Sequence, residues 1–287
     1  MTRSTVTCRS ALRGMLVAAV AMLPLLADAA ESPAAIPAYV VAAVADPSRP
    51  DSDRQRDADR KPAEVIAFAG IKPGDKLADL MPGRGYYTRI FCKLVGDGGH
   101  VYAIAVPFKR SGPLPADKPA EAVVGEPCGN VTATSLQPRM VPAPELWSSS
   151  DDPGGVYEYW AKSPAAENFT AAEPLDVIWT SENYHDLHNP AFGSPNLLTV
   201  GIALLNALKP GGILIVEDHA AEPGSGARDT ETLHRIDPAE VKRELLAAGF
   251  AFVAESPVLR HADDPHIVKA HAMHDRTDRF LLKFRKP

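Results

Sequence analysis

Residues 77–88 read LADLMPGRGYYT, and this stretch decides the fold of the chain. The apolar residues up to Leu80 predict a buried strand, and Gly83 and Gly85 predict a turn that opens a helix. Glycine adopts backbone conformations that side chains forbid, and it lets a ligand approach the main chain closely. Asp79 lies near the carboxyl end of the strand, where open α/β sheets bind ligands. An ordinary turn without a ligand fits this stretch as well as a cofactor-binding turn does. The remainder of the sequence therefore has to distinguish the two.

Apolar runs and helical patterns alternate around this stretch. The expected strands cover residues 76–80, 100–106, 130–136, 175–180, 213–216, 250–254 and 279–285, and the expected helices cover 62–69, 87–95, 196–208 and 238–248. This alternation predicts an α/β fold in which helices cover both faces of a mainly parallel sheet. No helix is evident between the last two strands, so we expect the last strand to be antiparallel.

The first 29 residues differ from the remainder. Three arginines precede an apolar run at residues 15–26, and small residues lie before Ala30. This pattern predicts a signal peptide that is cleaved near Ala29, and therefore a periplasmic or secreted protein. The run is shorter than the roughly 20 apolar residues of a membrane span. We therefore expect no stable membrane insertion after cleavage, and an uncleaved anchor is the alternative.

Residues 30–61 predict a linker and an N-terminal helical segment, in which the charge-dense residues 51–61 favour a solvated helix face. Within it, Asp57 and Lys61 have the spacing of an attractive helical pair. The main domain is expected at residues 62–287. A proline-rich stretch around residues 107–174 predicts an insertion in that domain.

Charge and cysteine content narrow the possible partners. The formal net charge is −6, and loss of the signal peptide would make the chain more acidic. A nucleic-acid partner is not expected, because phosphate binding requires a basic face. Cys92 and Cys128 remain after cleavage; they could pair in an oxidising compartment or stay as two buried thiols, and apolar surroundings favour the thiols.

Three segments, in this order, resemble the class I S-adenosylmethionine-dependent methyltransferases, and in particular an exported bacterial branch of predicted methyltransferases. They are residues 79–88, residues 183–189 (NYHDLHN) and residues 208–212 (LKPGG). The resemblance spans roughly residues 49–287. It implies a Rossmann-like methyltransferase sheet, S-adenosylmethionine as cofactor and an acceptor that is a small molecule.

The resemblance also implies roles for individual residues. In that family the first glycine turn wraps the methionine portion of the cofactor, and the acid of the first strand orients its amino group. The implied cofactor-binding residues are Asp79, Met81, Gly83, Gly85, Tyr86 and Asn183.

Two positions depart from the family pattern. The usual motif has glycine where this chain has Met81. The second strand usually ends in an acid that binds the ribose hydroxyls, whereas residues 103–107 (AIAVP) contain none. Loss of such a charged hydrogen-bond partner costs about 1.5–3 kcal/mol, so we expect weaker cofactor binding than the full motif would give.

The polar groups after two later strands are the candidate catalytic residues. His185 and Asp186 follow the fourth expected strand, and Asp218 and His219 end the next one, so all four should converge at one sheet edge. Methyl transfer is an in-line displacement that depends on positioning, and a base is useful only if the acceptor loses a proton. Histidine has a suitable pKa. We predict His185, Asp186 and His219 as catalytic, with either histidine as base and either aspartate orienting it.

Segments further along the chain are expected near the acceptor. Residues 232–235 (TLHR) either line its pocket or form a helix surface, and the long connection at 259–278 and the insertion are expected to shape the pocket.

Two other functions compete with methyl transfer. The first is a secreted metal-binding protein or metal-dependent hydrolase that uses His185, His188, Asp218 and His219, although this spacing matches no zinc signature. The second is a degenerate methyltransferase fold that serves as a binding module, because S-adenosylmethionine is made in the cytoplasm. The sequence assigns neither the acceptor nor an oligomeric state.

Overall fold

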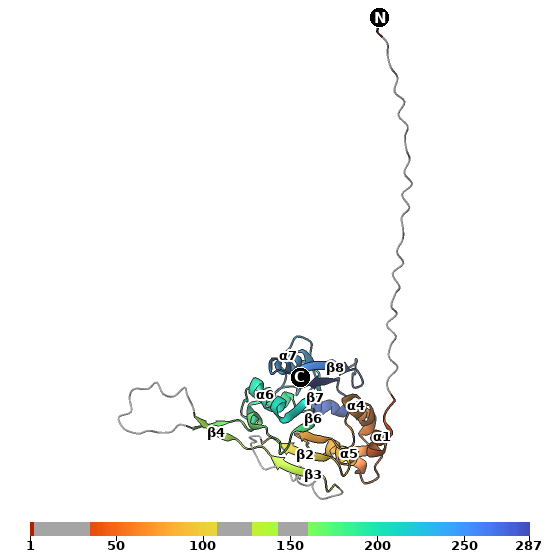
Figure 1. Ribbon diagram of the computed structural model, residues 1–287, viewed down its shortest axis with the longest axis vertical. Coiled ribbons are helices and arrows are strands. Elements are labelled where there is room, and N and C mark those ends of the chain that lie inside the picture. The colour runs from red at the N-terminus through yellow and green to blue at the C-terminus, as the bar shows by residue number, and fades with distance from the viewer. Residues whose placement is uncertain (3–34, 108–127, 143–159) are drawn as a thin grey trace, which may run out of the picture. The chain divides into compact units, whose positions relative to one another are not determined.

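The computed structural model describes residues 1–2, 35–107, 128–142 and 160–287 (Figure 1). Residues 36–287 form one compact unit. The predicted signal peptide and much of the predicted insertion lie outside the described residues. No helix in the described part of the chain is both long enough and apolar enough to cross a membrane.

A seven-stranded sheet in the order β3-β2-β1-β6-β7-β9-β8 is the framework of this unit (Figure 1). Its strands are β1 (Lys76–Leu80), β2 (His100–Ala105), β3 (Val131–Ser135), β6 (Leu175–Ser181), β7 (Leu208–His219), β8 (Ala251–Ser256) and β9 (Arg279–Arg285). The first five pair in parallel, and β9 is antiparallel to both of its neighbours. The mainly parallel sheet with an antiparallel last strand is therefore confirmed.

Four helices cover the two faces of the sheet: α4 (Pro62–Ala69), α5 (Tyr86–Val95), α6 (Leu197–Ala207) and α7 (Pro238–Ala247). Neighbouring residues of one strand face opposite sides, and the apolar core divides accordingly. Leu77 packs in the cluster that contains the apolar residues of α4 and α5, whereas Ala78 packs in the cluster of α6 and α7. Both faces are buried, as a parallel sheet requires.

The N-terminal segment folds onto this unit as α1 (Ala38–Val44), α2 (Asp51–Arg54) and α3 (Asp57–Arg60). The prediction of a solvated helix face holds for Asp51, Arg54 and their exposed neighbours, but Asp53 and Arg60 are buried, as is Arg49 just before this stretch. Their charges can be buried because each finds an opposite charge, as when Arg49 binds Asp57 at 2.7 Å. The predicted attraction between Asp57 and Lys61 is replaced, because the Lys61 ammonium donates to the carbonyl of Val258.

Part of the predicted insertion forms a separate two-stranded antiparallel sheet of β4 (Arg139–Pro142) and β5 (Trp160–Ser163). Short helices complete the described structure: η3 (Ala165–Asn168), η4 (His185–His188), η5 (Pro190–Phe192), α8 (Ala270–Met273) and η6 (His274–Arg276).

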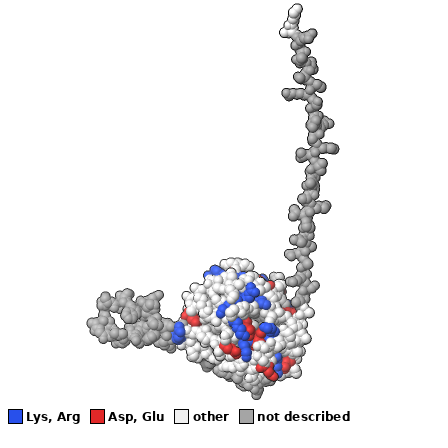
Figure 2. Space-filling model, in the orientation of Figure 1, with Lys and Arg blue, Asp and Glu red and all other residues white. Residues whose placement is uncertain are grey.

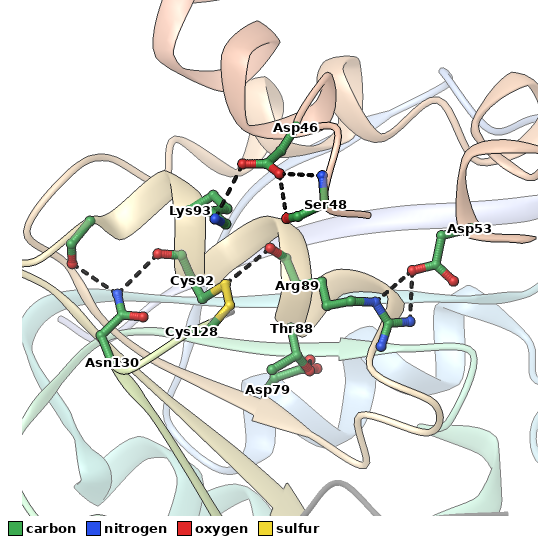
Figure 3. Close-up of a disulfide and its surroundings, with 11 residues drawn as sticks. Asp46, Ser48, Asp53, Asp79, Thr88, Arg89, Cys92, Lys93, Cys128 and Asn130 are labelled. Carbon is green, nitrogen blue, oxygen red and sulfur yellow. Dashed lines mark hydrogen bonds and ion pairs between the residues drawn. A yellow bond between two sulfur atoms is a disulfide. The ribbon is translucent and has the colours of Figure 1, made fainter. Parts of the chain in front are cut away.

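Cys92 and Cys128 form a disulfide, so the preference for two free thiols was wrong (Figure 3). Cys92 lies in α5, and Cys128 precedes β3. The Asn130 side chain donates to the carbonyls of Cys92 and Gly96 and holds the two segments together. The Cα atoms of Cys92 and Cys128 are 5.9 Å apart, within the range that a disulfide spans.

Candidate functional site

The turn after β1 has an unusual backbone. Met81, Gly83 and Gly85 all have positive φ angles, of 54°, 54° and 77°. Met81 thus adopts the conformation that glycine takes easily and that costs other residues roughly 1–2 kcal/mol. Hydrogen bonds hold it there: its amide donates to Ile104, and Asn183 donates to its carbonyl, both at 2.8 Å. Such strained positions concentrate at functional sites.

A cavity of about 300 Å³ lies against this turn. Five of the six predicted cofactor-binding residues line it, namely Asp79, Met81, Gly83, Tyr86 and Asn183. The sixth, Gly85, is the N-cap of α5 beside it. The structure brings these residues to one place, and their contact with a cofactor stays a prediction.

The acid of this cavity is deeply buried. Asp79 is 3% exposed, and the hydroxyl of Thr88 donates to its Oδ2 at 2.5 Å (Figure 3). Burial raises the pKa of Asp79 to about 7, and the Thr88 hydrogen bond opposes the rise only in part. A cationic ligand group would relieve this cost, because it would stabilise the carboxylate form.

Arginines from the N-terminal segment also line the cavity. Arg56 and Arg60 both belong to its lining, and both bind Asp275. The guanidinium carbon of Arg60 lies 4.8 Å from the centre of the Tyr86 ring, a cation–π contact. Neither arginine is among the site residues predicted from the sequence. Their spacing of four, which can place two side chains on one helical face, was the available signal.

A buried ion network supports the carboxyl ends of β6 and β7. Arg279 of β9 is fully buried, and its Nη1 lies 2.9 Å from Glu217 and 2.8 Å from Glu182. Glu217 also accepts hydrogen bonds from Tyr87 and Ser181.

On the face seen in Figure 2, acidic and basic side chains are intermixed, so this face is not uniformly basic.

The predicted catalytic residues converge at the same sheet edge. His185 is 2% exposed, and its Nδ1 lies 2.8 Å from Asp218, which is fully buried. Asp218 also accepts from the backbone amides of His185 and His219. Burial lowers the pKa of His185, but Asp218 more than offsets this, so the pKa lies above its usual value. Asp218, and not Asp186, holds the His185 ring in place.

His219 has different surroundings. Its ring centre is 6.0 Å from that of His185, and its Nδ1 lies 2.7 Å from the Thr277 hydroxyl. Burial lowers the pKa of His219 to about 4, so the imidazole is neutral at pH 7. It lines a second cavity, of about 420 Å³, together with His271.

The structure corrects two other expectations. His188 lies 3.3 Å from Glu244 of α7, so the predicted set of His185, His188, Asp218 and His219 is not assembled. Residues 232–235 form turns and not a helix. Within them, Arg235 is fully buried against Asp264, and only His234 reaches the site.

His234, which was predicted only as part of residues 232–235, lies against the predicted catalytic residue His185. Its φ is 54°, and its Nδ1 lies 3.4 Å from Nε2 of His185. Its ring also contacts that of His271, with centres 4.2 Å apart. Neither contact leaves a local pattern in the sequence, because the partners are distant along the chain.

The acid that usually ends the second strand of the family is also missing from the described structure. Strand β2 ends at Ala105, and buried Val106 follows. Among the residues described at this strand end, none carries a carboxylate. Residues 108–127, which come next, lie outside the described part of the chain.

The solved structures that share this fold include the two described next, whereas no protein-family model and no curated protein matches the chain. An S-adenosylmethionine-dependent methyltransferase from Aquifex aeolicus has a TM-score of 0.50 and 18% identity, over 83% of this chain and 99% of its own. The complex of the Haloferax volcanii Trm112 methyltransferase activator with a proposed methyltransferase gives a TM-score of 0.50 and 13% identity, over 87% and 98%. At such identities the likeness shows the fold: a Rossmann-like methyltransferase sheet.

Proposed function

We propose that this protein transfers a methyl group from S-adenosylmethionine to a small-molecule acceptor. The observation that carries the proposal is the cavity beside the strained turn, in which the buried Asp79 carboxylate faces the same space as Met81 and Gly83. The shared fold supports it, and the fold alone does not assign an activity.

The residues of this cavity fit the two charged groups of a methionine portion. Asp79 would hold the ammonium group, whose charge favours the ionised carboxylate. Arg56, which lines the cavity and whose side chain is 42% exposed, would hold the carboxylate. When bound, S-adenosylmethionine supplies a methyl group whose bond to the sulfonium sulfur breaks as the acceptor bonds to its carbon.

We assign the acceptor to the second cavity. It shares Arg56, Arg84 and Glu182 with the first cavity, so the two adjoin. His219 lines it and is neutral at pH 7. An acceptor proton would go to Nε2 of His219, because Nδ1 is engaged with Thr277. His219 is therefore the candidate base by position, because Nε2 of His185 faces His234 instead. With a pKa of about 4 it is a weak base, so it suits only an acceptor whose proton is acidic.

Calorimetry tests the proposal. We expect saturable binding of S-adenosylmethionine and S-adenosylhomocysteine to the mature protein, weakened at least tenfold in Asp79→Asn. Asp176→Asn is the matched control, because Asp176 lies at the opposite, amino end of β6 and binds Lys209. Absence of heat at millimolar ligand would overturn the proposal.

We also propose that the protein works outside the cytoplasm. The predicted signal peptide motivates this, and the disulfide between Cys92 and Cys128 supports it because disulfides persist in oxidising compartments. Mass spectrometry of the protein from its native host should find an N-terminus near Ala30. An intact residue 1–29 segment on a cytoplasmic protein would contradict export.

A further inference from the structure

Three potential metal ligands meet where η4 approaches the turn after β7. His185, Asp186 and His234 each offer one ligand atom, and these atoms lie within 4.8 Å of one another. Two of the residues are partly exposed and His185 is buried, so the cluster lies at the border of the protein interior. This set differs from the one that contains His188.

The separations of these atoms match a coordination shell. Nε2 of His185 lies 3.4 Å from Nδ1 of His234 and 3.5 Å from Oδ1 of Asp186, and the remaining separation is 3.8 Å. In a tetrahedral zinc site with bonds of about 2.0–2.1 Å, neighbouring ligand atoms are about 3.3–3.4 Å apart. An octahedral shell with the same bonds would bring them to about 3.0 Å. The observed triangle therefore fits tetrahedral coordination with small adjustments.

The surroundings of His185 are also those of a metal ligand. Metal-binding histidines usually donate their second ring nitrogen to a carboxylate, which sets the tautomer and the ring orientation. Asp218 provides this partner at 2.8 Å from Nδ1. With Nδ1–H donated to Asp218, the lone pair of Nε2 points toward His234 and Asp186.

We propose that His185, Asp186 and His234 bind a first-row divalent metal, for which Zn²⁺ is the best fit. Imidazole and carboxylate in a tetrahedral arrangement suit zinc, and three protein ligands leave a fourth position for water or substrate.

The site borders the second cavity. His219 and His271 line that cavity, and their rings lie against His185 and His234 respectively. If the acceptor occupies this cavity, which rests on the proposed function, an acceptor oxygen or sulfur can take the fourth position. The metal would then lower the pKa of that group before His219 removes its proton.

Zinc titration without S-adenosylmethionine tests the site, so failure of the metal site and failure of methyl transfer are distinguishable. We expect the metal-depleted mature protein to bind one tight Zn²⁺ per chain, and Co²⁺ in its place to give the intense visible bands of a tetrahedral centre. His234→Ala and Asp186→Asn each remove one ligand. Both should weaken Zn²⁺ binding by more than about a hundredfold, since loss of an outer-shell partner alone costs roughly 10–100-fold.

His188→Ala is the matched control, because it removes an imidazole that contacts Glu244 and not the three ligands. It should leave Zn²⁺ affinity unchanged, and melting curves establish that all variants fold. A hydrogen-bonded chain from Asp218 through His185 to His234 without metal is the competing explanation. Lack of stoichiometric Zn²⁺ in the wild type, or equal affinity in His234→Ala and wild type, would establish that explanation and overturn the metal site.

Discussion

The carboxylate of Asp79 accepts a hydrogen bond from the hydroxyl of Thr88 at 2.5 Å, and the two residues are 3% and 0% exposed. This contact joins the end of β1 to the first turn of α5. The one short hydrogen bond does not compensate for burial, so the pKa of Asp79 is raised to about 7. The residue is therefore sensitive to pH in the physiological range.

Cofactor affinity should depend on pH through Asp79. The ammonium group of S-adenosylmethionine requires the ionised carboxylate, so binding should strengthen as pH rises from 6 through about 7 and then level off. Thr88→Val removes a hydrogen bond to the carboxylate and should move this midpoint to higher pH. Calorimetry at several pH values measures both, and an equal slope in Asp79→Asn would assign the pH dependence to another group.

Without ligand, the free energy of unfolding should decrease as pH rises, whereas cofactor binding strengthens. Asp79 has a pKa of about 3.9 in an unfolded chain and about 7 in the folded protein, so between these values the folded state binds the extra proton. Its contribution to the free energy of unfolding is therefore complete below about pH 4 and lost as pH rises through 7. Asp79→Asn should melt at higher temperature than wild type at pH 8, with a gap that closes toward pH 4. A constant gap would mean that Asp79 ionises normally.

Position 81 should tolerate glycine better than alanine. Both substitutions remove the same buried side chain, but only glycine relieves the cost of a φ of 54°. We expect Met81→Gly to be more stable than Met81→Ala by about 1–2 kcal/mol in urea denaturation. At an ordinary position of the same kind the order is reversed, so greater stability of Met81→Ala would show that the turn does not hold this conformation.

Replacing Arg279 alone should destabilise the protein more than replacing Arg279 and Glu217 together. Arg279→Met leaves the fully buried Glu217 without its counter-charge, which costs about 3–5 kcal/mol. The double variant Arg279→Met, Glu217→Gln should recover much of this loss, because no uncompensated charge remains there. Urea unfolding of the two single variants and the double variant measures the coupling; additive losses would mean that the pair acts independently.

The disulfide should contribute measurably to stability. Cys92 and Cys128 are 36 residues apart, and closing a loop of this size stabilises a folded protein by about 2–4 kcal/mol. Replacing both with serine should lower the melting temperature, and a reductant should lower that of the wild type by a similar amount. A reductant that acts equally on the double serine variant would show that the effect does not come from this bond.

Much of the fold could be predicted from local patterns. The bounds of β1 and β9 agree with the expected ones, because short apolar runs with clear turn signals at both ends specify strands locally. The start of β7 was placed too late, since Lys209, Pro210 and the following glycines resemble a turn and yet continue the strand. The position of β9 between β7 and β8 left no local signal, because the side-chain pattern of a strand does not name its neighbours.

The candidate site was predictable to a lesser extent. Asp79, Gly83 and Asn183 follow from their positions at strand ends, which parallel strands bring to one edge of the sheet. Arg56 and Arg60 could not be placed, because a charge-dense helix is usually solvated and only distant partners such as Asp275 make burial possible. His188 was grouped with His185 because both are histidines near carboxylates, and the contact of His188 with Glu244 of α7 takes its side chain away from that group.

By itself the sequence determined the glycine turn, the alternation of strands and helices, and the sheet edge at which polar groups gather, because these depend on backbone preferences and on periodic burial. Only the tertiary structure decided which charges meet there. Asp218 contacts His185, Arg279 donates to Glu217, and His234 lies against His185, since contacts between distant segments depend on how whole elements pack.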